Sequence, residues 1–74
     1  MRLILHSSLK TGVYVYRLKS KALPNIGDVL VGENFKVRVL DVIGPVTEPF
    51  LVVKPLRGSK LPERVEAKVS SKRR

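Results

Sequence analysis

Apolar and polar residues alternate along much of this chain with the two-residue period that is typical of β-strands. The longest such run covers residues 35–43. Its first half places Phe35, Val37 and Val39 on one face of a strand, with basic residues between them on the other face. The run is therefore predicted to be a strand with one buried face and one solvated, cationic face.

The alternation changes phase in the second half of this run, because Leu40 and Val42 are apolar whereas Asp41 is not. A shift of one residue moves every later side chain to the opposite face of a strand. The pattern therefore predicts a β-bulge, or a strand that passes round a barrel corner, near these residues.

Short β-prone runs flank the long one, and glycine and proline turns separate them. They cover residues 2–6, 13–18, 29–31, 50–53 and 63–69. In the last run Val65, Ala67 and Val69 would point inward from a strand, although its Glu, Ala and Lys content also permits a helical turn. Six short strands without a substantial helix predict an all-β fold, a small six-stranded antiparallel β-barrel.

The length of 74 residues is enough for one domain, which we expect to span residues 1–69. Residues 70–74 contain no apolar side chain, and we expect them to form a disordered basic tail. The apolar runs are much shorter than the roughly 20 residues that cross a bilayer. We therefore expect a soluble protein without a membrane partner.

The composition does not favour an enzyme. The chain has no cysteine, which favours an intracellular compartment, and its single histidine, His6, has neither a nearby nucleophile nor metal-ligand spacing. The acidic residues form no recognisable catalytic pair, and isolated glycines form no phosphate-binding loop. We expect a non-enzyme with no metal, no cofactor and no small-molecule substrate.

The formal charge of +9 suggests an acidic partner, most simply RNA. Tyr14 and Tyr16 share a strand face and are followed by Arg17, as in a base-stacking platform, but buried aromatic rings more often cover a barrel surface or close one end of a core. Both interpretations remain open at this stage. The candidate RNA-proximal residues are Tyr14, Tyr16, Arg17, Lys36, Arg38, Lys72, Arg73 and Arg74.

The most apolar stretch, residues 41–55, predicts a strand, a Gly-Pro turn and a second strand bracketed by Pro49 and Pro55. Apolar groups at such a turn lack reactive chemistry but suit the surface of another protein. We predict a protein-binding rim formed by Ile43, Gly44, Pro45, Val46, Pro49 and Phe50.

Residues 39–55 read Val-Leu-Asp-Val-Ile-Gly-Pro-Val-Thr-Glu-Pro-Phe-Leu-Val-Val-Lys-Pro. This segment resembles the signature of the Gar-type subunit of box H/ACA ribonucleoproteins, the RNA-guided pseudouridine synthases. Residues 12–17 and 23–29 fall where that family has its second strand and a proline-led turn, so the resemblance spans residues 3–55. Ile43 replaces a usual phenylalanine and Val37 a common glycine, and Gly-Arg repeats are absent, as in the compact archaeal form.

The resemblance implies a barrel of the translation-factor and reductase type that is not itself catalytic. It further implies a subunit that docks on the catalytic pseudouridine synthase and assists loading and release of substrate RNA during rRNA pseudouridylation and ribosome biogenesis. Contact with guide and target RNA would then be indirect or weak. The implied location is the cytoplasm of an archaeal cell, or the nucleolus for a eukaryotic relative.

An autonomous RNA-binding barrel of the ribosomal-protein or oligonucleotide-binding type is the alternative. The cationic strand face and the tyrosine pair favour it, whereas the low aromatic content of 5% does not. Salt distinguishes the two, because phosphate-driven binding weakens steeply with salt and apolar docking changes little.

Overall fold

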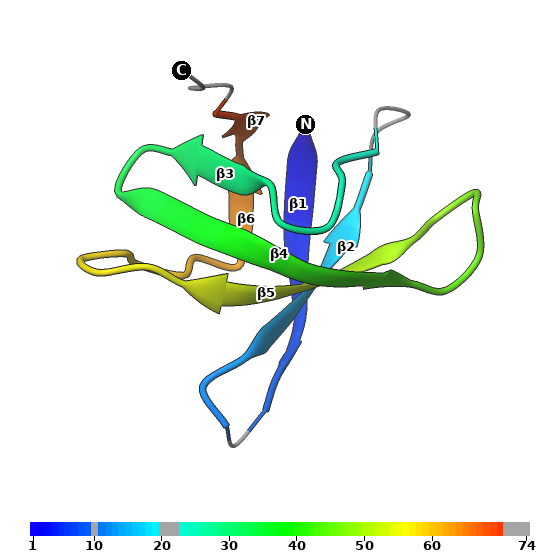
Figure 1. Cartoon of the computed structure of the whole chain (residues 1–74), viewed down its shortest axis with the longest axis horizontal. Coiled ribbons are helices and arrows are strands. Elements are labelled where there is room, and N and C mark those ends of the chain that lie inside the picture. Colours follow the sequence, from blue (N-terminus) through cyan, green and yellow to red (C-terminus); the bar gives the residue numbers. More distant parts are fainter. Residues whose placement is uncertain (10, 20–22, 71–74) are drawn as a thin grey trace.

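The computed structural model describes residues 1–9, 11–19 and 23–70, and these ranges contain strands and turns but no helix. Seven strands follow one another along the chain (Figure 1). They are β1 (Arg2–Ser8), β2 (Tyr14–Leu18), β3 (Val29–Gly32), β4 (Phe35–Ile43), β5 (Phe50–Pro55), β6 (Arg64–Glu66) and β7 (Lys68–Val69).

The strands form one sheet in the order β6-β1-β2-β5-β4-β3-β7, and every neighbouring pair is antiparallel. The long strand β4 crosses the front of the molecule, while β1 and β2 run behind it at a steep angle (Figure 1). The sheet therefore curves into a nearly closed barrel. The prediction of a small all-β antiparallel barrel is confirmed.

The segment that contains β6 and β7 accounts for the difference between six predicted strands and seven observed ones. β6 pairs with β1 at one edge of the sheet, and β7 pairs with β3 at the other. Ala67 lies between them, and its N–H donates to the carbonyl of Met1 at 2.8 Å. One extended run thus links the two edges, which confirms the strand interpretation over the helical turn.

Two bulges bend the sheet. Val39 pairs with Val53 and Asp41 pairs with Val52, so Leu40 is an extra residue in β4, at the predicted phase change. The phase change therefore marks a bulge, as predicted. A second irregularity places His6 as an extra residue between Leu5 and Ser7 of β1, and the alternation pattern gave no sign of it.

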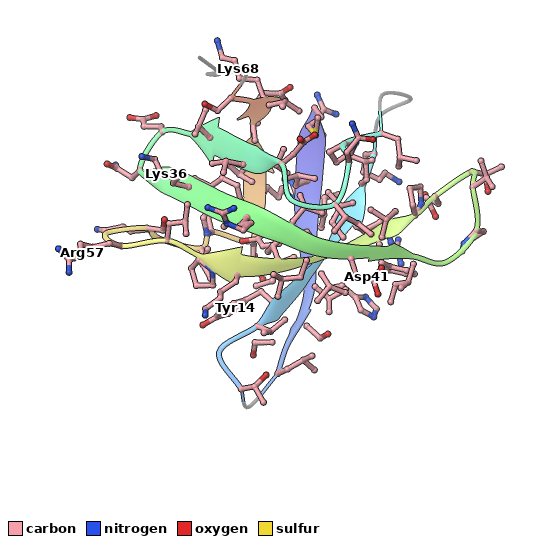
Figure 2. All side chains as sticks on the ribbon, viewed as in Figure 1. Tyr14, Lys36, Asp41, Arg57 and Lys68 are labelled. Atoms are coloured by element: carbon pink, nitrogen blue, oxygen red, sulfur yellow. The ribbon has the colours of Figure 1, made fainter. Side chains whose placement is uncertain are left out.

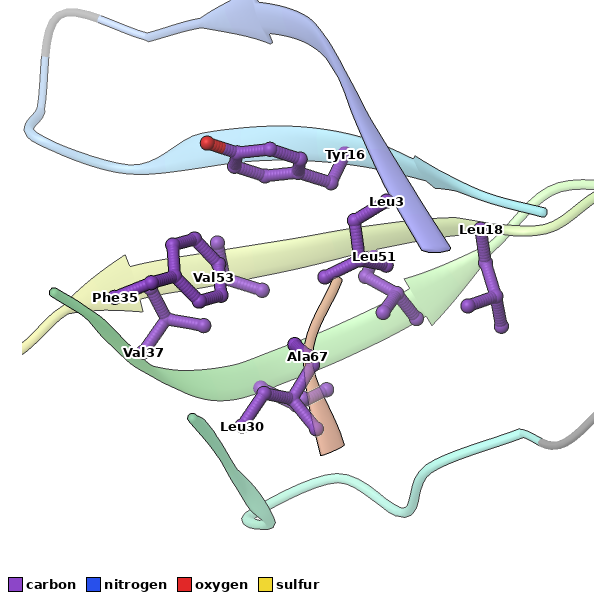
Figure 3. Packing of buried hydrophobic residues seen from close by; sticks show 10 residues of the cluster. Leu3, Tyr16, Leu18, Leu30, Phe35, Val37, Leu51, Val53 and Ala67 are labelled. Atoms are coloured by element: carbon purple, nitrogen blue, oxygen red, sulfur yellow. The ribbon is translucent and has the colours of Figure 1, made fainter. Parts of the chain in front are cut away.

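The barrel core contains large apolar side chains from all the long strands (Figure 3). Tyr16 and Phe35 meet edge to face, with ring centroids 5.6 Å apart. Full burial of an aliphatic or aromatic side chain of this size stabilises a fold by about 1.5–3 kcal/mol. The fully buried members are Leu3, Tyr16, Leu18, Leu30, Phe35, Val37, Val39, Leu51 and Val53.

The barrel contacts extend one residue beyond the predicted domain end. The N–H of Ser70 donates to the carbonyl of Val29 at 2.8 Å, so Ser70 continues the β7–β3 pairing. The rest of the predicted tail, residues 71–74, lies outside the described part of the chain.

Candidate functional site: an apolar docking surface

The predicted Gly-Pro turn is the loop of residues 44–49, which joins β4 to β5. The N–H of Glu48 donates to the carbonyl of Pro45 at 3.2 Å and closes a turn that carries Val46 at its tip. The side chain of Val46 is 91% exposed, the highest exposure among the large hydrophobic residues described. Ile43, which ends β4 beside this loop, is 45% exposed.

Gly44 fixes the start of the loop. Its φ of 91° lies in the left-handed region, which L-residues with a side chain rarely adopt. A Cβ at this position would also lie 3.0 Å from Cδ2 of Phe50. Gly44 therefore lets the loop turn sharply against the Phe50 ring.

Pro49, one of the six predicted rim residues, is buried. Its carbonyl accepts a hydrogen bond of 3.0 Å from the N–H of Leu18, at the end of β2. Its place is thus to hold the loop against β2, and it offers little surface to a partner. The prediction treated a proline beside a turn as exposed, but the ring here fills space under the loop.

Phe50 is half-buried on the outer face of the sheet, where it pairs directly with Ile43 and Arg17 on the neighbouring strands. The His6 ring lies 4.8 Å from the Phe50 ring, centroid to centroid, at a tilt of 48°. Cζ of Arg17 lies 5.6 Å from the same ring centroid, within the range of a cation–π contact. These contacts hold the Phe50 ring in place beside the loop.

An open hollow lies between the loop and the end of β2. Lys19 bridges part of its edge, because its Nζ donates to Oε2 of Glu48 at 2.9 Å. This hydrogen bond, together with the positive charges of Lys19 and Arg17, lowers the pKa of Glu48. The hollow is lined by Leu18, Lys19, Leu23, Val46, Thr47, Glu48 and Pro49.

Sequence reasoning missed three exposed apolar residues near this loop: Leu23, Ile26 and Leu40, which are 54%, 64% and 39% exposed. Leu23 shares the hollow with Val46. The N–H of Gly27 donates to the carbonyl of Val39 at 2.8 Å, which brings the residue before it, Ile26, alongside the bulge at Leu40. For Leu23 and Ile26, the available signal in the sequence was their position on either side of a Pro-Asn turn.

These residues extend the predicted rim along one end of the barrel. We call this surface the apolar end, and its exposed members are Leu23, Ile26, Leu40, Ile43 and Val46. Hydrogen-bonded backbone surrounds it on three sides: the bulge in β4, the turn of residues 44–49 and residues 25–28 before β3. Such a preformed apolar surface can bind a partner without first being ordered.

The candidate RNA-proximal residues do not gather at one place. Tyr16 is fully buried and belongs to the core, so its ring has no face to offer a base, and this corrects its inclusion among them. Tyr14 is half-buried and packs against the core cluster, while Arg17 lies over Phe50. Lys36 and Arg38 are exposed on the outer face of β4, and residues 72–74 lie outside the described ranges.

The described residues show no arrangement suited to metal chemistry, since no three His, Cys, Asp or Glu side chains among them could hold an ion together. Asp41, in the apolar half of β4, is exposed, and its Oδ1 accepts a hydrogen bond of 2.8 Å from the N–H of Val42. Nothing in these ranges has the helical length and apolarity needed to span a membrane.

Comparisons with protein-family models, with curated proteins and with solved structures found no match to this chain.

Proposed function

We propose that this protein is a non-catalytic accessory subunit that docks on the catalytic subunit of an RNA-guided pseudouridine synthase through its apolar end. The observation that carries the proposal is the placement of Val46, 91% exposed at the tip of a turn inside the segment that resembles the H/ACA signature. A valine held in water at a fixed position stabilises a complex when a partner covers it.

The geometry around Val46 supports a binding role for the turn. Gly44 and the buried Pro49 fix the two ends of the loop, and Phe50 packs beneath its start. A loop that is already ordered loses little conformational entropy on binding. The same signature residues thus account both for the shape of the loop and for its exposed apolar surface.

The alternative, an autonomous RNA-binding barrel, is less well supported. Its base-stacking platform required two accessible tyrosines, and Tyr16 is fully buried beneath the sheet. We therefore rank protein docking first and treat phosphate contacts separately below.

The test is a calorimetric titration of the protein into the catalytic pseudouridine synthase subunit, at low and at high salt. We expect binding that changes little with salt, because burial of apolar side chains would drive it, although Asp41 lies exposed between Leu40 and Ile43. The variant Val46→Glu would place an unpaired charge in the interface and should weaken binding by about 2 kcal/mol or more, roughly thirtyfold. Its fold should be unchanged, because position 46 contacts solvent.

Leu9→Glu is the matched control, because Leu9 is, like Val46, an exposed aliphatic residue, at 49%, but it lies between β1 and β2. It changes charge and hydrophobicity in the same way and should leave affinity unchanged. Wild-type affinity in Val46→Glu would rule out the proposed surface. Equal losses in both variants would show that binding responds to net charge, which would also contradict the proposal.

A further inference from the structure

The outer face of the β4–β5 pair changes character at the Leu40 bulge. Beyond the bulge the outward residues are apolar apart from Asp41, but before it they are basic. Arg38 and Lys54 are exposed and lie directly opposite each other on the two strands. Directly opposed like charges destabilise an antiparallel pair, so this arrangement has a cost in the free protein.

The loop of residues 56–60 adds more positive charge at the same place. The N–H of Leu56 donates to the carbonyl of Lys36, and the N–H of Lys60 to the carbonyl of Asn34, both at 2.8 Å. The Ser59 hydroxyl oxygen accepts from the N–H of Lys36 at 3.0 Å. These bonds fasten the loop to the β3–β4 hairpin and bring Arg57 and Lys60 beside Lys36.

The basic residues continue across β3, because β3 pairs with both β4 and β7. Val31 lies opposite Lys36 on one side and opposite Lys68 on the other. Figure 2 shows Lys36 on β4 and Arg57 at the tip of the loop after β5 on the same side of the barrel, with Asp41 further along β4. We call this surface the cationic face, and its members are Lys36, Arg38, Lys54, Arg57, Lys60 and Lys68.

Acidic side chains do not neutralise this face. Within the described ranges, the carboxylates that lie within 4.0 Å of a positive group are those of Glu48 and Glu66. Their partners are Lys19, Arg2 and the terminal amino group, none of which belongs to the cationic face. Among the described residues, no carboxylate thus forms an ion pair with Arg38 or Lys54, and both charges are open to an external anion.

We propose that the cationic face binds the phosphodiester backbone of a nucleic acid without reading its sequence. The nearest aromatic rings, Tyr14 and Phe35, pack against or inside the core, so the described face offers lysine and arginine but no ring for stacking. Contacts of this kind position a nucleic acid without specifying bases. The inference is independent of the proposed docking, because it concerns the opposite half of the β4–β5 pair.

The experiment measures binding of the full chain to fluorescently labelled single-stranded oligouridine by anisotropy over a range of salt concentrations. An RNA of about 20 nucleotides exceeds the roughly 4–16 nucleotides that one small barrel covers. With three to five phosphates neutralised, log affinity should fall against log salt with a slope of about −2 to −3.5. A slope near zero would overturn the proposal.

The informative variant is Lys54→Glu. It should weaken RNA binding about tenfold and reduce the salt slope by about one. Its thermal unfolding temperature should be unchanged or higher, because the new carboxylate faces Arg38 and turns a repulsive pair into an attractive one. If Lys54 had only a structural role, Lys54→Glu would lower the unfolding temperature instead.

Arg64→Glu is the charge-matched control, since Arg64 is exposed on β6 and pairs with Ile4, away from the cationic face. It should retain most of the RNA affinity. Equal loss in both variants would show diffuse attraction to net charge and would overturn the site. Equally tight binding of polyglutamate would overturn the nucleic-acid assignment in favour of acidic protein.

Discussion

The hydroxyl of Tyr16 donates a hydrogen bond of 2.7 Å to the carbonyl of Pro62. The two residues are 46 positions apart, and the bond joins β2 to the segment that leads into β6. It gives the one polar atom of a fully buried ring a partner. The tyrosine thus contributes both to the core and to closure of the barrel.

Replacement of Tyr16 by phenylalanine should lower the free energy of unfolding at neutral pH by about 0.5–1.5 kcal/mol, the net value of one such hydrogen bond. The ring and its contact with Phe35 remain, so the fold should be unchanged. Urea denaturation of the two proteins measures the difference. The same substitution at Tyr14, whose hydroxyl has no such bond to Pro62, is the control.

Stability should also fall at alkaline pH. Burial, aided by the neighbouring Tyr14, raises the pKa of Tyr16 from 10.0 to about 12. The folded state thus favours the neutral phenol, and this contribution is complete below pH 10 and lost as the pH rises to about 12. The loss should reach about 2–3 kcal/mol, measured as the unfolding free energy against pH. Tyr16→Phe should lack this decline, and an identical decline in that variant would contradict the assignment.

Gly44→Ala should destabilise the protein by more than Gly12→Ala. Both glycines have positive φ, 91° and 83°, so each alanine meets a backbone penalty of about 1–2 kcal/mol. Only position 44 also has a close neighbour, Cδ2 of Phe50 at 3.0 Å, whereas nothing lies within 4 Å at position 12. The difference between the thermal unfolding temperatures of the two variants isolates the effect of the contact with Phe50. Equal shifts would show that the Phe50 ring moves aside without a loss of stability.

Deletion of Leu40 should keep the two faces of β4 as they are, because Asp41 would then follow Val39 directly and regular alternation would leave Asp41 outward and Val42 inward. The deletion removes the extra bend and twist that the bulge gives to β4. We expect the altered curvature to lower the free energy of unfolding by about 1–3 kcal/mol without unfolding the barrel. Leu40→Ala keeps the bulge and should change stability by about 0.5 kcal/mol or less. Circular dichroism and chemical denaturation of both proteins provide the measurement.

The titration of Glu48 should depend on Lys19. The hydrogen bond and charge of Lys19 are the leading causes of the lowered pKa of Glu48, with Arg17 contributing less. Lys19→Ala should therefore raise this pKa toward its usual value, and Arg17→Ala should raise it less. Carboxyl chemical shifts followed by NMR against pH report both changes. Because the folded pKa is the lower one, any stability from this pair is present above the unfolded pKa and fades as pH falls through the folded value.

The sequence was most informative where a pattern is local. The range of β4 and the position of its bulge follow from alternation and from the polarity of Asp41, because a phase change shows directly in the order of residues. The bulge at His6 was not predictable in this way. The residues after it, Ser7 and Ser8, are polar and small, so a slip between faces leaves no mark on the pattern.

The candidate site depended on contacts between distant segments. Leu23 belongs to the site because the loop before β3 runs beside β4, a pairing that the sequence does not encode locally. The burial of Pro49 has the same origin, since it depends on the end of β2. Lys54 was overlooked because its significance arises from the register that places it opposite Arg38.

The bulge at Leu40 also sets how the two surfaces relate. Arg38 and Ile43 are five residues apart, so a regular strand would turn them to opposite faces. The bulge instead lets the β4–β5 pair present Arg38 and Lys54 outward at one end and Ile43 outward at the other. A ligand covering one end leaves the other open, so a protein and a nucleic acid would bind with nearly additive free energies rather than compete. The β4–β5 pair would then connect two molecules, and its length would set the distance between them.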